Sequence, residues 1–251
     1  MKKIRLAARL DVKDNYLVKG IQLEGLRKMG RPNEFAKRYY EEGIDEIIYM
    51  DIVASLYNRN NLGEIVRRTS DEVFIPITVG GGLRSVDDVR KILSLGADKA
   101  AINTAAIKNP ALITQVAKSF GSQCMVLSIE AKKTRDGLYE CYYDNGREHS
   151  GLEVCEWAKK AVSLGAGEIL LTSVDKEGFQ RGMDLELIKA VSTAVDVPVI
   201  CSGGAGNAQD VAKAATAGAS AVAVASVLHY GKADVRTLKN DIIKEGIDVR
   251  L

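Results

Sequence analysis

Residues 73–104 read VFIPITVGGGLRSVDDVRKILSLGADKAAINT, and residues 195–226 read VDVPVICSGGAGNAQDVAKAATAGASAVAVAS. The landmarks of the two stretches recur at one constant offset, which pairs Pro76 with Pro198, Gly81 with Gly203, Gly96 with Gly218 and Thr104 with Ser226. An acid stands near the head of each half of the chain, Asp11 in the first and Glu130 in the second. This repetition predicts a fold built from two similar halves, roughly residues 1–122 and 123–251.

Short apolar runs alternate with segments of helical spacing along the whole chain. The strand-like runs are residues 4–10, 45–51, 74–79, 98–102, 123–129, 167–172, 197–201 and 220–225. The helix-like segments are residues 32–43, 59–71, 85–95, 109–119, 151–164, 184–194, 207–217 and 234–245, and Ser85, Asn109 and Asn207 are typical helix-start residues. The runs lack strict alternation, which suits strands that are buried on both faces. The pattern predicts one domain over residues 1–251, a (β/α)8 TIM barrel, with a doubly wound sheet as the competing architecture.

Composition excludes several classes of protein. The formal net charge of +2 carries no nucleic-acid signature, and no apolar run approaches the roughly 18 residues of a membrane span. Charged residues interrupt the basic N-terminus, so that it is no signal peptide, and we expect a cytoplasmic protein. The four cysteines share no C-x-x-C spacing and the chain has two histidines, so we expect neither a metal site nor a cofactor.

Two connections are longer than usual, and both follow strands on the face where the active sites of such barrels lie. Residues 11–31 follow the first strand and residues 130–150 follow the fifth. The second connection reads as a β-hairpin with turn residues at 144–146. Long connections at this face are natural lids over a bound ligand.

Glycine-rich turns follow the third and seventh strands. Gly81 and Gly82, with Asn103 and Thr104 after the next strand, form what we call the first cradle. The second cradle is its repeat: Gly203, Gly204, Ala225 and Ser226. Glycine lets backbone N–H groups approach an anion closely, and hydroxyls and amides stand beside each turn. Tight barrel turns would explain one such site, but two equivalent ones predict a ligand with a phosphate at each end.

Asp11 and Glu130 end the first and fifth strands, on opposite sides of the barrel mouth and between the two cradles. A carboxylate on each side of a substrate is the arrangement for general acid–base catalysis. The same groups would also serve to cap loop amides or to pair with neighbouring lysines, and position alone leaves both interpretations open. Asp51 and Asp175, after the second and sixth strands, add further acceptors at this rim; we expect Asp175 to bind substrate.

Segments over nearly the whole chain resemble the cyclase subunit of imidazole glycerol phosphate synthase. They are LDVK (10–13), VKG (18–20), EGLR (24–27), VGGG (79–82), INTAA (102–106), GAGEILLTS (165–173), SGGAG (202–206) and VRL (249–251). The sister isomerase of histidine synthesis shares the barrel and the repeat, but residues 18–27 and the C-terminus match the synthase. The resemblance implies that a glutaminase subunit docks on the N-terminal face of the barrel and releases ammonia. Ammonia then crosses the barrel, attacks a bisphosphorylated substrate and closes an imidazole ring.

The resemblance also implies roles for particular residues. Its two catalytic acids fall on Asp11 and Glu130, and its phosphate contacts fall on the two cradles. A charged gate for ammonia falls on four residues at strand starts: Arg5, Glu46, Lys99 and Glu168. Lys19, on the lid after the first strand, is expected within reach of a substrate anion.

Three departures from the family pattern cluster at the barrel mouth. The second acid is Glu130 instead of Asp, and the extra methylene shifts its carboxylate by roughly 1.5 Å. Arg9 stands where the family usually has Cys, two residues before Asp11 on the same strand. Phe179 and Arg181 stand where the family has small polar residues. These changes resemble the sequences of second-copy subunits that are found with surface-polysaccharide genes. Residues 54–62 (ASLYNRNNL) resemble those copies too.

Three functions therefore remain open from the sequence. The first is a lyase-type cyclase that uses channelled ammonia on a phosphorylated substrate of histidine biosynthesis. The second is a paralogue that delivers ammonia for amidine formation on an N-acetylated nucleotide sugar. The third is a non-catalytic barrel that only activates its glutaminase.

Overall fold

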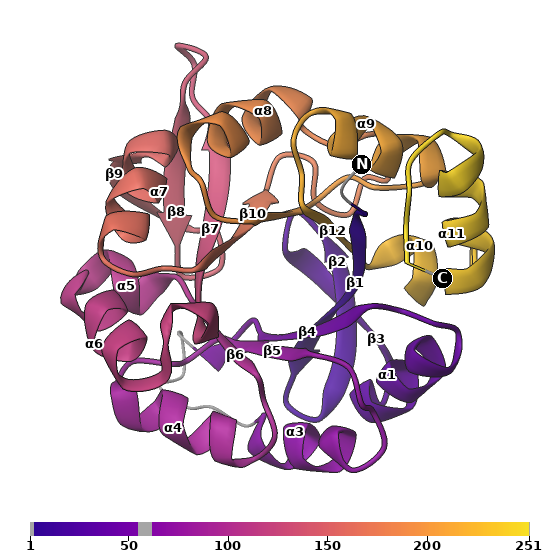
Figure 1. Cartoon of the computed structure of the whole chain (residues 1–251), viewed down its shortest axis with the longest axis horizontal. Coiled ribbons are helices and arrows are strands. Elements are labelled where there is room, and N and C mark those ends of the chain that lie inside the picture. The colour runs from indigo at the N-terminus through magenta and orange to yellow at the C-terminus, as the bar shows by residue number, and fades with distance from the viewer. Residues whose placement is uncertain (1–2, 55–61, 251) are drawn as a thin grey trace.

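The computed structural model describes residues 3–54 and 62–250, and it confirms the predicted barrel (Figure 1). The barrel strands are β1 (Arg5–Lys13), β4 (Glu46–Asp51), β5 (Ile77–Gly80), β6 (Lys99–Ile102), β7 (Met125–Lys133), β10 (Glu168–Ser173), β11 (Val199–Ser202) and β12 (Ala221–Val224). Neighbours in this order pair in parallel. The sheet closes because β1 pairs with β12, from Arg5 opposite Ala221 to Ala8 opposite Val224.

Helices surround this barrel on the outside (Figure 1). The longer ones are α1 (Pro32–Glu41), α3 (Gly63–Ser70), α4 (Val86–Ser94), α6 (Ala111–Phe120), α7 (Val154–Ser163), α8 (Leu185–Ala194), α9 (Ala208–Thr216) and α11 (Val235–Lys244). They lie where the sequence predicts helices, although residues 59–61 of one prediction and most of segment 54–62 are outside the described residues. No helix of residues 3–54 and 62–250 is long and apolar enough to cross a membrane.

The predicted helix starts are correct in two of three cases. Ser85 accepts a hydrogen bond from the Asp88 amide in a capping box, and Asn207 accepts one from Asp210. Asn109 is wrong as a start: it ends the short helix α5 (Thr104–Lys108), and Pro110 precedes α6 without a side-chain cap. The reason is that α5 and α6 follow each other so closely that Asn109 is needed in their connection.

Side chains fill both sides of the strands. The larger apolar core lies between the strands and the helices, and it explains why β4 and β10 are buried along their whole length. A second apolar cluster fills the barrel interior with mostly small or branched residues: Ala7, Val18, Ile48, Met50, Ile52, Val53, Ala101, Val126, Leu170, Ile200, Ala221 and Ala223. The interior is thus a packed apolar layer between the two ends of the barrel.

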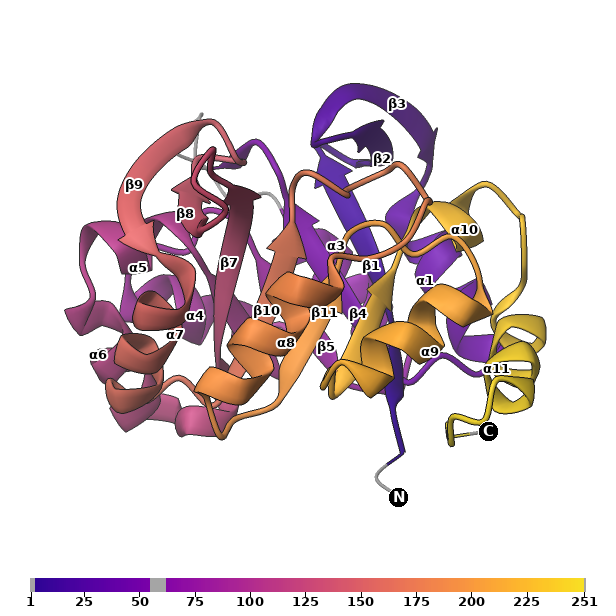
Figure 2. The same ribbon diagram turned by 90° about the horizontal axis from the view of Figure 1, so that it is seen from above.

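Two antiparallel hairpins rise above one end of the barrel, opposite the N-terminus (Figure 2). The first, β2 (Tyr16–Ile21) and β3 (Glu24–Gly30), continues from β1 and forms a regular hairpin where the sequence indicated only a long connection. The second, β8 (Tyr139–Tyr143) and β9 (Glu148–Glu153), is the hairpin predicted from its turn residues. Both hairpins therefore extend the strands that carry Asp11 and Glu130.

The C-terminal helix α11 is bonded to the end of the barrel where the strands begin, opposite the two hairpins. The Lys239 side chain of α11 is buried, and its ammonium donates hydrogen bonds to Asp45 Oδ1 at 2.8 Å and to the Gly43 carbonyl oxygen at 2.6 Å. The other oxygen of Asp45 accepts a 2.7 Å bond from the Leu6 amide of β1. One buried ion pair thus connects α11, β1 and the start of β4.

We predict that Lys239→Met lowers the free energy of unfolding by about 3 kcal/mol, because it leaves the buried Asp45 carboxylate without its cation. Urea denaturation followed by circular dichroism measures the loss. Lys244→Met on the exposed side of the same helix is the matched control, with an expected change below about 0.5 kcal/mol. Equal stabilities of the two variants would contradict the importance of this pair.

Candidate active site

The largest well-formed cavity near the predicted acids opens at the carboxyl ends of the strands and has a volume of about 380 Å³. All four residues of the first cradle line it, together with Arg9 and Glu130. Asp51 also lines this cavity, and the cations Arg84 and Lys108 stand at its wall. The structure therefore brings the first cradle and one predicted acid into the same space.

Glycine is required in the first cradle by its backbone geometry. Gly81 has a φ of 93° and Gly82 a φ of 71°, in the region that side chains disfavour. A Cβ on Gly81 would lie 2.1 Å from the Asp51 carbonyl oxygen of the neighbouring strand end. The turn can therefore pass close to the end of β4.

The second cradle repeats this backbone but holds much less space. Gly203 and Gly204 have φ values of 101° and 97°. The cavity that all four residues of this cradle line has a volume of about 20 Å³. The loop after β10 lies over it: the Gly182 amide donates a 3.1 Å hydrogen bond to the Gly204 carbonyl, and a Cβ on Gly204 would lie 2.2 Å from the Gly182 oxygen.

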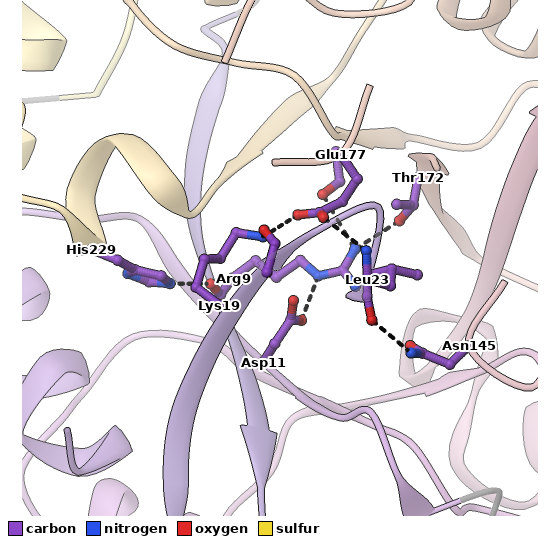
Figure 3. A network of polar contacts seen from close by, with 10 residues as sticks. Arg9, Asp11, Lys19, Leu23, Asn145, Thr172, Glu177 and His229 are labelled. Atoms are coloured by element: carbon purple, nitrogen blue, oxygen red, sulfur yellow. Dashed lines mark hydrogen bonds and ion pairs between the residues drawn. The ribbon is translucent and has the colours of Figure 1, made fainter. Parts of the chain in front are cut away.

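Arg9 lies at the centre of the mouth and is 4% exposed. Its Nε donates a 2.9 Å bond to Asp11 Oδ1 (Figure 3). Its Nη1 reaches across the barrel to the hydroxyls of Thr172 on β10, at 2.8 Å, and Ser202 on β11, at 3.3 Å. Burial of a guanidinium is tolerated because these partners satisfy it. Arg9 lines the cavities of both cradles and therefore separates them.

The Arg9 backbone is also held from outside the barrel. Its carbonyl oxygen lies 3.0 Å from Nε2 of His229, whose Nδ1 lies 2.8 Å from the Tyr39 hydroxyl. Burial lowers the pKa of His229 to about 4, so the ring is neutral at physiological pH. A neutral ring that donates from Nε2 and accepts from Tyr39 satisfies both contacts. This arrangement fixes β1 at the point where Arg9 enters the mouth.

Glu130 lies across the mouth from Asp11 in a different environment. Burial raises the pKa of Glu130 to about 7, although the charge of Arg9 and a 2.7 Å hydrogen bond from the Gly146 amide both favour the carboxylate. Asp11, in contrast, has the Arg9 guanidinium as a direct ion-pair partner. The two acids thus suit different tasks near neutral pH, Glu130 as a proton donor and Asp11 as a carboxylate.

Lys19 lies on β2, in the lid after β1 where the sequence placed it, and its role toward a substrate anion stays a prediction. Its side chain is 2% exposed, and its ammonium forms an ion pair with Glu177 in the loop after β10 (Figure 3). The other carboxylate oxygen of Glu177 accepts a 3.2 Å bond from the Leu23 amide at the hairpin tip. Lys19 thus neutralises a protein carboxylate and lines neither cradle cavity.

Asp175, which the sequence analysis expects to bind substrate, shares its loop with Glu177, which that analysis does not single out; the role of Asp175 stays a prediction. Asp175 accepts a 2.8 Å hydrogen bond from the Lys133 amide and lines neither cradle cavity, so the structure gives it a turn-fixing contact. Glu177 lines the second cradle's cavity. The sequence signal that could have indicated Glu177 is the glycine that follows it. A glycine at a loop tip allows the loop to pack closely against another segment. Gly178 indeed packs so closely that a Cβ would lie 2.6 Å from the Gly20 oxygen.

The four residues of the charged gate meet at the opposite end of the barrel. Arg5 forms ion pairs with Glu46 and, at 2.6 Å, with Glu168. Lys99 lies 2.7 Å from Glu168 and 3.7 Å from Glu46. Positive and negative groups alternate, so the charges compensate one another. Burial raises the pKa of Glu46 against the effect of its two cations.

Within residues 3–54 and 62–250, no group of three or more His, Cys, Asp or Glu side chains is placed to hold a metal ion. The polar groups at the mouth include the two acids, Arg9 and the backbone of the cradles. Together with the repeated halves, they define a (β/α)8-barrel enzyme with its acids and anion-type turns at the carboxyl ends of the strands.

Comparison with known proteins identifies the family. The profile of a family described as "Histidine biosynthesis protein" matches residues 5–234, and the chain belongs to this family. A Legionella pneumophila protein named "Imidazole glycerol phosphate synthase subunit HisF" is 61% identical over 210 residues, which cover 84% of this chain and 99% of that protein. Proteins of the same name from Lactococcus lactis subsp. lactis (strain IL1403) and Streptococcus sanguinis (strain SK36) are 48% and 47% identical. The matches cover 98% and 100% of this chain, and 96% and 100% of the relatives.

We predict that the stability gained from protonated Glu130 is present below the carboxyl's ordinary pKa of 4.5 and is lost as the pH rises through about 7. In this window the folded state holds a proton that the unfolded state has released. Glu130→Gln removes the effect, so the stability of the variant relative to the wild type rises between pH 5 and pH 8, by on the order of 1–3 kcal/mol. Urea denaturation at both pH values measures it.

The exposed Glu148→Gln is the matched control for this titration. Carbon-13 NMR of labelled glutamate carboxyls gives a second readout, since the Glu130 signal should titrate near pH 7. A Glu130 signal that titrates below pH 5 would contradict the assignment of Glu130 as the proton donor.

Proposed function

We propose that the chain is the ammonia-using cyclase subunit of a glutamine-dependent synthase of the imidazole glycerol phosphate synthase type. The relatives carry this name, and the chain matches them along nearly its whole length. One observation carries the proposal. Two acids in different environments, Glu130 with a raised pKa and Asp11 in an ion pair with Arg9, lie at the mouth beside the cavity of the first cradle. The substrate class is a phosphorylated acceptor, as expected for histidine biosynthesis.

The geometry supports a division of labour between the acids. When ammonia adds to a carbonyl carbon of the acceptor, a C–N bond forms and the carbonyl electron pair moves to oxygen. Glu130, whose pKa burial raises to about 7, donates a proton to that oxygen. Asp11 takes a proton from the attacking nitrogen, and Arg9 beside it stabilises the carboxylate that performs this step. The added hydroxyl then leaves as water to give an imine. Ring closure follows when this nitrogen attacks a second electrophilic carbon of the acceptor and the C–N bond from that carbon to the carboxamide nucleotide breaks, so that the nucleotide leaves as an amine.

Ammonia would enter through the charged gate. A glutaminase subunit that docks on the N-terminal face releases it there, and the next layer toward the mouth is the apolar cluster of the barrel interior. Neutral ammonia passes small apolar side chains such as Ala7, Ala101 and Ala221 at lower cost than ammonium does. The first cradle's cavity begins beyond this layer, since Ala101 and Met50 belong to both.

Two residues at the mouth, Arg9 and the longer acid Glu130, favour an alternative acceptor for the ammonia. Ammonia delivery for amidine formation on an N-acetylated nucleotide sugar needs the same gate and interior but a differently shaped mouth. Arg9 divides the mouth between the two cradles, which is the region where an altered acceptor would be recognised. Both functions use Asp11 and Glu130, whereas a purely activating barrel would need neither.

We predict that Asp11→Asn lowers turnover with ammonium salt by at least about 10²-fold, because it removes the base. The assay follows consumption of the phosphorylated histidine-pathway acceptor by the purified chain. Asp136→Asn, on the exposed loop between β7 and β8, is the control and should keep full activity. Full activity of Asp11→Asn and Glu130→Gln in the complete complex would instead establish the non-catalytic activator.

We predict that Lys99→Met separates the two ammonia sources. Glutamine-dependent turnover of the complex should fall on the order of tenfold, since the variant leaves Glu46 and Glu168 short of one cation at the gate. Turnover with external ammonium salt should change less than twofold, because the mouth is untouched. The exposed Lys91→Met is the control. Equal losses from both ammonia sources would count against this route.

A further inference from the structure

Arg9 crosses one side of the barrel between the apolar layer and the mouth. Its backbone lies on β1, and its Nη1 donates hydrogen bonds to Thr172 on β10 (Figure 3) and to Ser202 on β11. In the closed sheet β12 lies between β1 and β11. The side chain therefore spans the side of the barrel that β10, β11 and β12 form. The first cradle's cavity lies on the other side, between β4 and β7.

The residues below Arg9 leave room for it to cross. Ala223 of β12 is opposite Ala7 of β1 on one side and opposite Ser202 of β11 on the other. An alanine has only a methyl group, so the long side chain of Arg9 can pass over β12 and reach the hydroxyls beyond it. Ala7 and Ala223 both belong to the apolar cluster of the barrel interior. Arg9 therefore lies directly above that cluster on this side.

The apolar cluster borders both cavities of the mouth. Met50 and Ala101 of the cluster line the first cradle's cavity, which has a volume of about 380 Å³. Ala223 of the same cluster lines the second cradle's cavity, which has a volume of about 20 Å³. Arg9 lines both cavities. A small molecule that crosses the interior thus meets two ways out, and Arg9 lies between them.

Contacts along its whole length hold Arg9 in this position. Its carbonyl oxygen contacts His229, its Nε is bonded to Asp11, and its Nη1 is bonded to the two hydroxyls. The side chain is buried. Moving it aside would separate a buried ion pair, which is strongly unfavourable. Arg9 is therefore a fixed partition between the two cavities.

We propose that Arg9 is a positioning residue that closes the interior route on the side of β10, β11 and β12, so that channelled ammonia has a single exit, into the cavity that Glu130 lines. This inference rests on the proposed function, because it requires ammonia in the barrel interior. Ammonia is similar in size to water, which needs roughly 10–15 Å³ of such volume. The second cavity has room for one such molecule. Without the partition, ammonia could leave by that side and miss the acid.

Cysteine labelling of the full-length chain tests the partition without any turnover. Ala101→Cys places a thiol at the first cavity, and Ala223→Cys places one beyond Arg9. Methyl methanethiosulfonate, a small neutral reagent, should modify the first thiol on the order of tenfold faster than the second, as measured by peptide mass spectrometry. In the Arg9→Ala background the two rates should come within about threefold of each other. Equal rates with Arg9 present, or a thiol in Ala223→Cys that stays protected in Arg9→Ala, would overturn the proposal.

Thr172→Val is a milder variant that serves if Arg9→Ala does not fold. It keeps the ion pair between Arg9 and Asp11 but removes the acceptor at the far end of the side chain. It should speed the labelling of Ala223→Cys at least about threefold. Thr216→Val, on the exposed side of α9, is the matched control and should leave the rate unchanged.

The native Cys124, which is buried in the core between strands and helices, reports general unfolding in the same samples. Its labelling rate should stay constant in Thr172→Val. A rise at Ala223→Cys that is matched at Cys124 would reflect general unfolding and would count against the partition.

The complex with the glutaminase subunit shows whether the partition directs ammonia. The wild type should consume about one glutamine for each acceptor converted, and Thr172→Val at least about two, because ammonia is lost through the second cavity. This ratio does not depend on the absolute rate. An unchanged ratio in a variant whose second side is open to labelling would overturn the proposal. Absence of any turnover would sink only the proposed function, and a second side that stays closed in Arg9→Ala only the present inference.

Discussion

The structure of the mouth depends on one buried charge. A guanidinium inside a protein must be matched by acceptors, since an uncompensated buried charge is strongly destabilising. Arg9 meets this constraint with Asp11 on its own strand and with hydroxyls on β10 and β11. Asp11 is therefore the direct ion-pair partner of Arg9. Burial is the largest influence on the pKa of Glu130. The chemical difference between two acids in equivalent halves follows from this single side chain.

Much of the fold was readable from the sequence, because its signals are local or periodic. Continuous apolar runs identified all eight barrel strands, and the repeat indicated closure. The four charged residues at the strand starts were expected together because a resemblance carried them, and they do contact one another; their role as a gate stays a prediction. The hairpin of β2 and β3 was not identified, since its strands mix charged and apolar residues without clear alternation.

The side-chain partners at the mouth were harder to predict than the backbone. Lys19 and Glu177 are far apart in sequence and meet only because two loops fold over the same rim. The sequence around Asp175 does not indicate that its carboxylate accepts a hydrogen bond from the Lys133 amide. The space in each cradle is likewise invisible in the glycine pattern. Glycine is retained in both because the turns have positive φ and pack against neighbouring carbonyls, whether or not a ligand binds.

The contacts of the first hairpin's tip connect three separate segments over the mouth. The Leu23 amide is bonded to Glu177, and the Leu23 carbonyl accepts a 3.4 Å hydrogen bond from Asn145 in the turn of the second hairpin. Two hairpins and the loop after β10 are therefore mechanically joined at one residue. Exchange of ligand between the cavity and solvent then follows the kinetics of one cooperative opening instead of three independent ones, and a change at the tip alters the speed of all three segments.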